Sequence, residues 1–274
     1  MKPYRRAFIE ITNRCGLGCA FCAPTSRPPE DMSPELFREA ARQAGLLAEV
    51  LSLHVLGEPL LHPLFPGLLG TCSRLGLKVN LVTNGLRLAD FPPAVLAEPC
   101  LAQVSISLHA LSTLPEAERP ARIAAMAAFA KTRRPGLTVG FRLRSESEDA
   151  FFRATLKTLL AGFDAAAAPG ADYVKLADGV FLNFGGIFDW PGGAGGRPRA
   201  GCLGLKHHFG ILSDGRVVPC CADFDGAMAL GNIKEAPLAD ILGSRAARDL
   251  RLGIAGTAPM PRYCASCGFS APDA

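Results

Sequence analysis

The 274-residue sequence has few aromatic residues, little excess charge and no apolar run long enough to span a membrane. Residues 1–8 carry Lys and Arg with no apolar stretch after them, which predicts neither a signal peptide nor a membrane anchor. Aromatic residues make up 7%, with a single Trp, and the formal charge is only +4, so nucleic-acid binding is not expected. The absence of an export signal predicts a cytoplasmic protein in a reducing compartment.

The composition is otherwise that of a globular protein. Hydrophobic residues make up 49% and charged residues 20%, which is enough apolar material for a sizeable core. The length suits one large domain, or one domain and a small appendage. Ten cysteines in a reducing compartment indicate metal ligands or catalytic thiols rather than a disulfide framework.

Strand and helix patterns alternate over the first 180 residues. Strands are predicted at 8–12, 50–56, 77–83, 104–108, 137–143 and 173–176. Helices are predicted at 34–48, with Ser33 as N-cap and Pro34 first, and at 63–75, 92–96, 120–131 and 150–163. This α/β order favours a parallel sheet with crossover helices. A complete eightfold barrel needs about 250 residues, so a partial barrel or an open sheet fits better.

The pattern changes near residue 190. A Gly-rich stretch at 191–196 reads as a linker or loop, and 209–219 predicts a hairpin that turns at Asp214–Gly215. A helix with a charged outer face is predicted at 238–252. We therefore expect two domains, residues 1–200 and residues 201–274, the second being small and rich in cysteine.

Three cysteines, Cys15, Cys19 and Cys22, follow the first predicted strand with the spacing C-x3-C-x2-C. A 4Fe-4S cluster needs four iron ligands, usually Cys, so three thiolates leave one iron open to a substrate or cofactor. Gly16 and Gly18 are expected to let this loop curl tightly. A zinc site and buried free thiols are the alternatives, although zinc usually takes four closed ligands and no fourth Cys or His stands nearby.

This cysteine loop, with the aromatic Phe21 before its last cysteine, resembles the cluster loop of the radical S-adenosylmethionine (SAM) superfamily. Residues at successive predicted strand ends extend the resemblance over most of the chain. It implies a partial (β/α)6 barrel and a SAM-binding 4Fe-4S cluster on Cys15, Cys19 and Cys22. It also implies cofactor-binding roles for Phe21, Gly57, Glu58, Thr83, Asn84, Ser107 and Arg142.

Within that resemblance, Gly57–Glu58 holds the amino group of SAM. Thr83, Asn84 and Ser107 hold its methionine or ribose part. Each of these residues also has an ordinary structural reading. Glu58 with the following proline forms a strand-to-helix turn, Asn84 with the following glycine forms a turn, and Ser107 is a hydrogen-bonded core hydroxyl.

A second set of cysteines occupies the last quarter of the chain: Cys202, Cys220, Cys221, Cys264 and Cys267. Spacing alone permits either a zinc site or an iron–sulfur cluster. Segments 215–221 and 230–233 and the final C-x2-C pair resemble the SPASM extension of radical SAM enzymes, in its shorter Twitch form. The resemblance is closest to the 2-deoxy-scyllo-inosamine dehydrogenases. It implies an auxiliary 4Fe-4S cluster that conducts electrons, with the ligands Cys202, Cys220, Cys264 and Cys267.

Three further residues are candidate catalytic groups. The Cys221 thiol is predicted either to donate a hydrogen atom to a substrate radical or to pack as a small apolar group. His54 and His109 lie on predicted strands, where each is either a substrate contact or base, or a hydrogen-bonded structural residue. Cys72 and Cys100 stand among apolar residues and are expected to be core thiols.

The resemblance implies an enzyme that cleaves SAM reductively and abstracts hydrogen from a C–H bond. An auxiliary cluster favours two-electron oxidation of an alcohol or amine carbon, in an aminocyclitol or sugar. Epimerisation of a sugar or peptide with Cys221 as hydrogen-atom donor is the alternative. A small-molecule or peptide substrate and an external one-electron reductant such as flavodoxin or ferredoxin are the expected partners, without nucleic acid or membrane. A zinc or iron–sulfur scaffold without enzymatic activity is the competing class.

Overall fold

The structure of the protein is a computed structural model that describes residues 2–168, 170–191 and 201–269. The chain divides into two compact units. The first unit comprises Met1–Arg14, Ala23–Lys78 and Phe188–Ala274, and the second comprises Cys15–Cys22 and Val79–Ile187. The domain boundary predicted at residue 200 lies outside the described residues and stays a prediction. In the described part of the chain, no helix has the length and apolar character needed to cross a membrane.

The strands of the first unit lie in the order β10-β9-β8-β1-β2. Strand β1 (Tyr4–Ile9) pairs in parallel with β2 (Ala48–Leu53) on one side and with β8 (His208–Ile211) on the other. Strand β9 (Arg216–Val218) pairs antiparallel with β8 and with β10 (Gly231–Asn232). The predicted hairpin is therefore confirmed. The first predicted strand is placed too late, because the chain leaves the sheet after Ile9 and Thr12 bridges Asp31 instead.

The helices of the first unit are α1 (Pro34–Leu47), α2 (Phe65–Arg74), α6 (Leu238–Gly243), α7 (Arg245–Ile254), α8 (Arg262–Ala265) and the 3₁₀ turn η1 (Pro59–Leu61). Helix α1 begins as predicted, since the Ser33 hydroxyl accepts a hydrogen bond from Leu36 N and Pro34 occupies the first turn. The single helix predicted at 238–252 is wrong. Ser244 interrupts it and caps α7 by accepting from Ala247 N.

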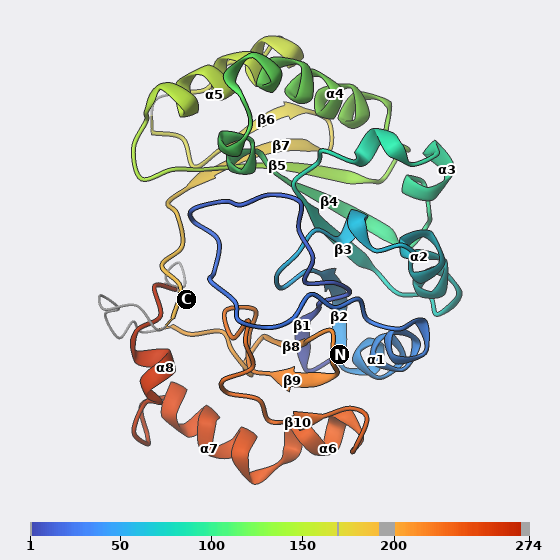
Figure 1. Cartoon of the computed structure of the whole chain (residues 1–274), viewed down its shortest axis with the longest axis vertical. Helices are drawn as coiled ribbons and strands as arrows, with labels where there is room; N and C mark the ends of the chain where they lie inside the picture. The colour runs from blue at the N-terminus through green and yellow to red at the C-terminus, as the bar shows by residue number, and fades with distance from the viewer. Residues whose placement is uncertain (1, 169, 192–200, 270–274) are drawn as a thin grey trace. The chain divides into compact units, whose positions relative to one another are not determined.

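In the second unit, β3 (Val79–Thr83), β4 (Leu101–Ser107), β5 (Thr138–Arg144) and β7 (Val180–Gly185) pair in parallel in that order. Helices α4 (Arg119–Thr132) and α5 (Ala150–Phe163) pack on each other beside β5 and β7 (Figure 1). The short elements are α3 (Pro93–Leu96), η2 (Leu88–Asp90), η3 (Leu108–Thr113) and η4 (Glu116–Glu118). The result is a mixed α/β fold with a parallel sheet.

The sixth predicted strand has a different place in the sheet. It exists as β6 (Tyr173–Ala177), but it pairs antiparallel with β7, which the sequence reading missed. The overlooked signal is the turn at Asp178–Gly179, where Gly179 adopts a φ of +65°. The Lys175–Asp178 ion pair at this hairpin is exposed.

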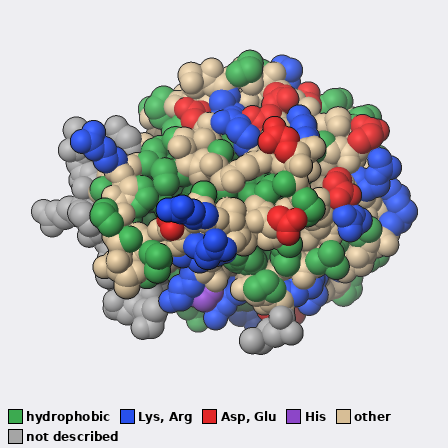
Figure 2. All heavy atoms as spheres, turned by 90° about the horizontal axis from the view of Figure 1, so that it is seen from below, with side chains coloured by type: hydrophobic (Ala, Val, Ile, Leu, Met, Phe, Trp, Pro, Cys, Tyr) green, Lys and Arg blue, Asp and Glu red, His purple; other side chains and the backbone are tan. Residues whose placement is uncertain are grey.

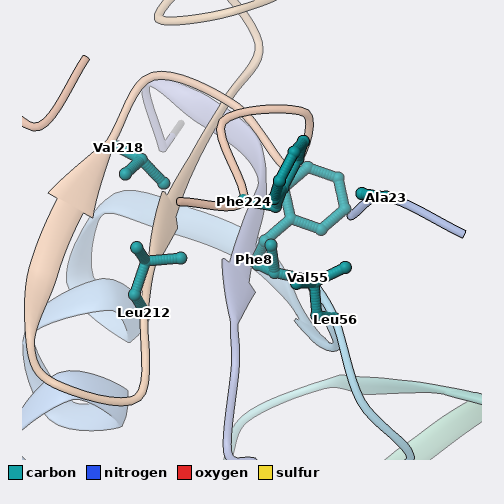
Figure 3. Packing of buried hydrophobic residues seen from close by; sticks show 7 residues of the cluster. All are labelled: Phe8, Ala23, Val55, Leu56, Leu212, Val218 and Phe224. Carbon is teal, nitrogen blue, oxygen red and sulfur yellow. The ribbon is translucent and has the colours of Figure 1, made fainter. Parts of the chain in front are cut away.

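An apolar cluster lies in the first unit where β1 and β2 face the β8–β9 hairpin (Figure 3). Phe8 and Phe224 lie close together in it, with Val55 and Leu56 on one side and Ala23 near Phe224 (Figure 3). Cys72 and Cys100 are buried, as expected of core thiols. Figure 2 shows one face of the surface, where side chains of both charges are interspersed with hydrophobic ones. Apart from Pro191, the Gly-rich stretch lies outside the described residues.

The Ser33 cap gives a stability prediction. Ser33→Ala is expected to lower the free energy of unfolding by about 1 kcal/mol, because Leu36 N loses its acceptor. Ser33→Gly is the matched control and should cost only a few tenths of a kcal/mol, since Gly is tolerated at an N-cap. Urea unfolding of both variants measures the difference, and equal losses would contradict the capping role.

Candidate iron–sulfur and SAM site

The three N-terminal cysteines gather in one loop of the second unit. Cys15 and Cys22 are exposed and Cys19 is half-buried, and Cys22 N donates to Cys19 O at 3.0 Å. Burial, with smaller contributions from the charges of Cys15 and Cys22, raises the pKa of Cys19 to about 11. That coupling places the three sulfurs within electrostatic reach of one another.

The proposed role of the loop glycines is not supported. Neither Gly16 nor Gly18 adopts a positive φ, and a Cβ at either position would meet nothing within 4 Å. The loop therefore reaches this conformation without the left-handed backbone that only glycine adopts readily. The prediction failed because a glycine in a loop permits a left-handed backbone but does not show that the loop uses one.

The Gly57–Glu58 turn follows β2 and is held by close backbone contacts in the first unit. Glu58 N donates to Arg14 O at 2.8 Å, and the buried Glu58 carboxylate caps η1 by accepting from Leu60 N at 3.1 Å. Gly57 has a φ of +76°, and a Cβ there would lie 2.3 Å from Thr12 O. The backbone geometry therefore requires glycine at position 57. Glu58 forms the strand-to-helix turn that the sequence analysis gave as its structural alternative.

In the second unit, Thr83, Ser107 and Arg142 lie at the ends of neighbouring strands. Ser107 pairs in register with Arg142 across β4 and β5, and Thr83 pairs with Ile106 across β3 and β4. The parallel strands therefore bring these residues to one edge of the sheet, where such folds bind ligands. Thr83 Oγ1 also accepts from Gly85 N at 2.9 Å. The Ser107 hydroxyl makes no hydrogen bond within the described residues and is available to a ligand.

Asn84 also shapes the turn after β3. Its Oδ1 accepts from Leu86 N at 3.0 Å, which matches the structural reading of this residue. The turn continues through Gly85, whose φ is +80°. A Cβ there would lie 2.8 Å from Met126 Cε, so the turn packs tightly on α4. A ligand role for Asn84 stays a prediction.

Phe21 and His109 form one wall of a cavity of about 250 Å³ in the second unit. Their rings meet edge to face with centroids 5.0 Å apart. His109 Nδ1 lies 3.2 Å from Arg142 O, and burial lowers the pKa of His109 to about 4. His109 is therefore neutral at physiological pH and suited to hydrogen bonding or proton acceptance.

Arg144 projects into the same cavity, and the sequence reading did not single it out. Its guanidinium donates to Asn183 O at 3.2 Å and covers Gly185. Within the described residues it forms no ion pair, and burial followed by the charge of Arg142 lowers its pKa to about 10. The carboxylates nearby are engaged elsewhere, Glu146 with Ile187 N and Asp149 with Phe152 N.

Four of the C-terminal cysteines lie within electrostatic reach of their neighbours in this set, in the first unit. The position of a Cβ on Gly204 would lie 3.5 Å from Cys202 Sγ and 3.7 Å from Cys220 Cβ, so these two cysteines flank Gly204. Burial, and then Cys202 and Cys267, raise the pKa of Cys264 to about 11. The pKa of Cys220 is also raised, by burial and then by Cys221 and Cys202. The predicted auxiliary ligands are thus brought together from three separate segments.

The segment that carries the last cysteine pair is fastened to the rest of this unit. The Tyr263 hydroxyl donates to Ala222 O at 2.8 Å, and Gly268 N donates to Asp189 O at 2.9 Å. Asp223 is fully buried beside these residues, with Oδ1 unpaired and Oδ2 accepting from Met228 N. Within the described residues, no three His, Cys, Asp or Glu side chains are close enough to hold a single metal ion.

Cys221 and His54 both lie in the first unit. Cys221 is half-buried and packs against the apolar cluster, and its charge acts on Arg6. The ring of His54 meets Phe8 edge to face at 5.3 Å. Both placements agree with either reading of these residues, and their catalytic roles stay predictions.

The sequence analysis missed a buried ion pair in the first unit, between Glu10 and Arg27. Glu10 is fully buried and accepts from Arg27 Nη2 at 2.5 Å. A lone carboxylate between Ile9 and Ile11, within the first predicted strand, was the available signal, because a buried charge requires a partner.

Comparison with known families agrees with this arrangement. Residues 9–143 match the radical SAM superfamily, and residues 202–268 match SPASM, an iron–sulfur cluster-binding domain. The chain therefore carries a radical SAM domain followed by a SPASM domain. The first implies a 4Fe-4S cluster with SAM, and the second implies an additional auxiliary iron–sulfur cluster.

Two curated relatives match only part of the chain. A PqqA peptide cyclase from Streptomyces rochei is 36% identical over 104 residues, which is 37% of this chain and 29% of the relative. The tungsten-containing aldehyde ferredoxin oxidoreductase cofactor-modifying protein of Pyrococcus furiosus is 31% identical over 110 residues, 39% of this chain and 31% of the relative. The matched stretch thus spans less than a third of either relative.

Solved structures share the fold over nearly the whole chain. BtrN in complex with AdoMet and 2-DOIA has a TM-score of 0.61 at 16% identity, covering 98% of this chain and 95% of that one. SuiB of Streptococcus suis bound to its precursor peptide SuiA has a TM-score of 0.59 at 15% identity, covering 97% of this chain and 70% of that one. At these identities the similarity shows the fold.

The residues present fit the implied groups. A thiolate is the ligand that an iron–sulfur cluster requires, and both sets of cysteines are gathered without disulfides. Burial, and then the neighbouring cysteines, raise the pKa of Cys19 and Cys264, and the positive charge of bound iron would favour the thiolate forms that ligate it. The backbone of Thr12 lies so close to Gly57 that a side chain would not fit at this position.

Gly57→Ala tests this close backbone packing. The new Cβ would lie 2.3 Å from Thr12 O at a φ of +76°, so the variant should lose more than about 2 kcal/mol of unfolding free energy. Gly67→Ala in α2 is the control, because a Cβ there meets nothing within 4 Å, and it should be neutral or stabilising by about 0.5–1 kcal/mol. Similar small effects in urea unfolding would contradict the proposed strain.

His109 gives a pH prediction. Its pKa of about 4 in the folded protein lies below the unfolded value of about 6.5, so the unfolded chain binds the extra proton between these values. The stability of the native protein therefore falls as pH falls through this window. His109→Gln should reduce the stability lost between about pH 7.5 and pH 5 by about 1 kcal/mol, allowing for partial exposure. An unchanged pH dependence in urea unfolding would refute this.

Proposed function

We propose that this protein is a radical SAM oxidoreductase that cleaves SAM reductively and abstracts hydrogen from a substrate C–H bond. The observation that carries the proposal is the pair of cysteine sets, one of three and one of four, each gathered within its own unit. Three ligands leave one iron of the first cluster open, whereas four close the second. The two domain matches support the same division.

When bound, the open cluster and SAM supply a carbon-centred radical that removes hydrogen from the substrate. The chain's own residues bind and orient these groups. In this proposal Gly57 and Glu58 hold the amino group of SAM. Thr83, Asn84, Ser107 and Arg142 hold its methionine or ribose part, with Phe21 beside them. Exclusion of water and orientation of the C–H bond are the protein's contribution to the rate.

The proposed reaction is the two-electron oxidation of an alcohol or amine carbon in an aminocyclitol or sugar. Support comes from the fold shared with BtrN, whose structure holds AdoMet and 2-DOIA. The neutral His109 provides a proton acceptor at the cavity wall, and His54 is the alternative base. Cys202, Cys220, Cys264 and Cys267 would hold the auxiliary cluster that takes the second electron outward.

Epimerisation is the second candidate, and the position of Cys221 favours it. This half-buried thiol directly follows a predicted auxiliary ligand and packs on the apolar cluster. The Cys221 thiol would donate a hydrogen atom to the substrate carbon radical and become a thiyl radical, which the external reductant would return to the thiol with one electron and one proton, so that the substrate is inverted without net oxidation. The PqqA peptide cyclases and peptide-bound SuiB make a peptide the alternative substrate class for either reaction. Flavodoxin or ferredoxin is the proposed reductant.

Metal analysis after anaerobic purification tests the class. We expect about eight irons per chain and reductive SAM cleavage with dithionite. Replacing Cys15, Cys19 and Cys22 by Ala should leave about four irons and abolish cleavage, whereas Cys264→Ala with Cys267→Ala should leave about four irons and retain uncoupled cleavage. About two zinc ions per chain without cleavage would support a scaffold instead.

Cys221→Ala separates the two reactions. The variant should keep its iron and its uncoupled SAM cleavage under either one. With candidate aminocyclitols or sugars, a dehydrogenase keeps forming a product two electrons more oxidised than the substrate. An epimerase loses its product, and the native enzyme incorporates deuterium from D2O into it. Loss of the oxidised product in the Cys221→Ala variant would contradict the proposed two-electron oxidation.

A further inference from the structure

Glu10 is a buried carboxylate whose two oxygens accept four hydrogen bonds from three separate segments. Oε1 accepts from Arg27 Nη2 at 2.5 Å, from Ser213 N at 3.2 Å and from Ser213 Oγ at 3.1 Å. Oε2 accepts from Leu56 N at 3.1 Å. The side chain is fully buried and both oxygens are occupied, so Glu10 is neither a base nor a ligand in this arrangement.

Each donor belongs to a segment that continues into a candidate functional group. Leu56 directly precedes the Gly57–Glu58 turn. Arg27 lies on the arm, residues 23–27, by which the chain leaves the N-terminal cysteine loop. Ser213 lies in the turn of the β8–β9 hairpin, whose second strand leads to Cys220. Glu10 follows β1, which lies between β2 and β8 and so reaches all three segments.

The arm is fastened to the C-terminal extension by further contacts. Arg27 Nη1 donates to Phe224 O at 2.8 Å, and Thr25 Oγ1 donates to Asp225 Oδ1 at 2.5 Å. Ala23 at the start of the arm lies next to Phe224 in the apolar cluster (Figure 3). Burial lowers the pKa of Arg27, but the hydrogen bond to Glu10 and the charges of Glu10, Asp214 and Asp225 together outweigh this effect, and the pKa is raised.

For electrostatic reasons, the contacts of Glu10 with Arg27, Ser213 and Leu56 are expected to form or break together. Two opposite charges that are both removed from water stabilise each other only while they remain paired. Loss of either one leaves a buried charge without compensation, and the segments can then move apart. The contacts to Leu56 and Ser213 are therefore expected to depend on the same pair.

We propose that Glu10 is a positioning residue. It holds the Leu56–Glu58 turn, the arm at residues 23–27 and the hairpin turn at Ser213 in one fixed arrangement. The inference rests on the proposed function, because the turn is there assigned to the amino group of SAM. Its consequence is that SAM affinity depends on a contact with the C-terminal extension, although the extension itself supplies no SAM-binding residue.

Glu10→Gln in the anaerobically purified holoenzyme tests the proposal. The variant keeps the shape of the side chain but loses the charge that pairs with Arg27. We expect about eight irons per chain, as in the native protein, and at least a tenfold rise in KM for SAM in dithionite-driven cleavage, with kcat changed less than about threefold. The dissociation constant of SAM, from equilibrium dialysis, should rise in parallel with KM.

Glu30→Gln is the matched control. Glu30 Oε2 also accepts from Ser213 Oγ, at 3.2 Å, but Glu30 is half-buried and forms no ion pair with an arginine in the part of the chain that the structure describes. It should leave KM and the dissociation constant within about twofold of the native values, because an isolated partly exposed contact contributes little.

Two results would overturn the proposal. One is a Glu10→Gln protein with native iron content and native KM, and the other is lost iron with a normal KM in the loaded fraction. If the Glu10→Gln variant does not fold, the Arg27→Lys variant is used in its place. Lysine keeps the positive charge but lacks the two-pronged guanidinium group, so KM for SAM should rise about threefold or more. Failure of the native protein to cleave SAM would instead refute the proposed function itself.

Discussion

Strand β1 is the constraint on which the first unit depends, because it pairs in parallel with β2 and with β8, two strands far apart in the sequence. Parallel neighbours end at the same edge of a sheet. The Gly57–Glu58 turn after β2 and the hairpin after β8 therefore emerge beside the end of β1. Glu10 stands at that point and is satisfied by a donor from each side. A loop rearrangement at this edge would have to break a buried charge pair.

Much of this site followed from spacing in the sequence, and the misses have physical causes. Cysteine spacing predicted the first set of ligands and the family resemblance predicted the second, and Ser33–Pro34 and the pattern at 150–163 located helix ends, because these signals are local. The β6–β7 hairpin was missed because the local turn signal at Asp178–Gly179 was overlooked, so the strand that follows this turn was not predicted. Arg144 and Glu10 were missed because their partners come from other elements, and neither partner is visible from the residue type alone.

The structure also separates two kinds of candidate residue. Glu58, Thr83 and Asn84 all accept hydrogen bonds that shape their own turns, so their side chains are already fixed before any ligand binds. Ser107 makes no such bond in the described residues, and its orientation is set by β4 alone. Fixed turns favour rigid recognition of SAM, since little conformational entropy is then lost on binding.

The auxiliary site carries a structural consequence as well as an electronic one. Cys202 and Cys264 belong to distant segments, and burial, followed by the charges of Cys202 and Cys267, raises the pKa of Cys264 to about 11. In the proposed auxiliary site, a cluster bound to both cysteines would favour their thiolates and would close a long loop, which restricts the unfolded chain. The loop it closes includes Ser213 and Phe224, the two residues through which the extension holds Arg27. Assembly of the proposed auxiliary site would therefore stabilise the same contacts that fix the arm leaving the first cysteine loop.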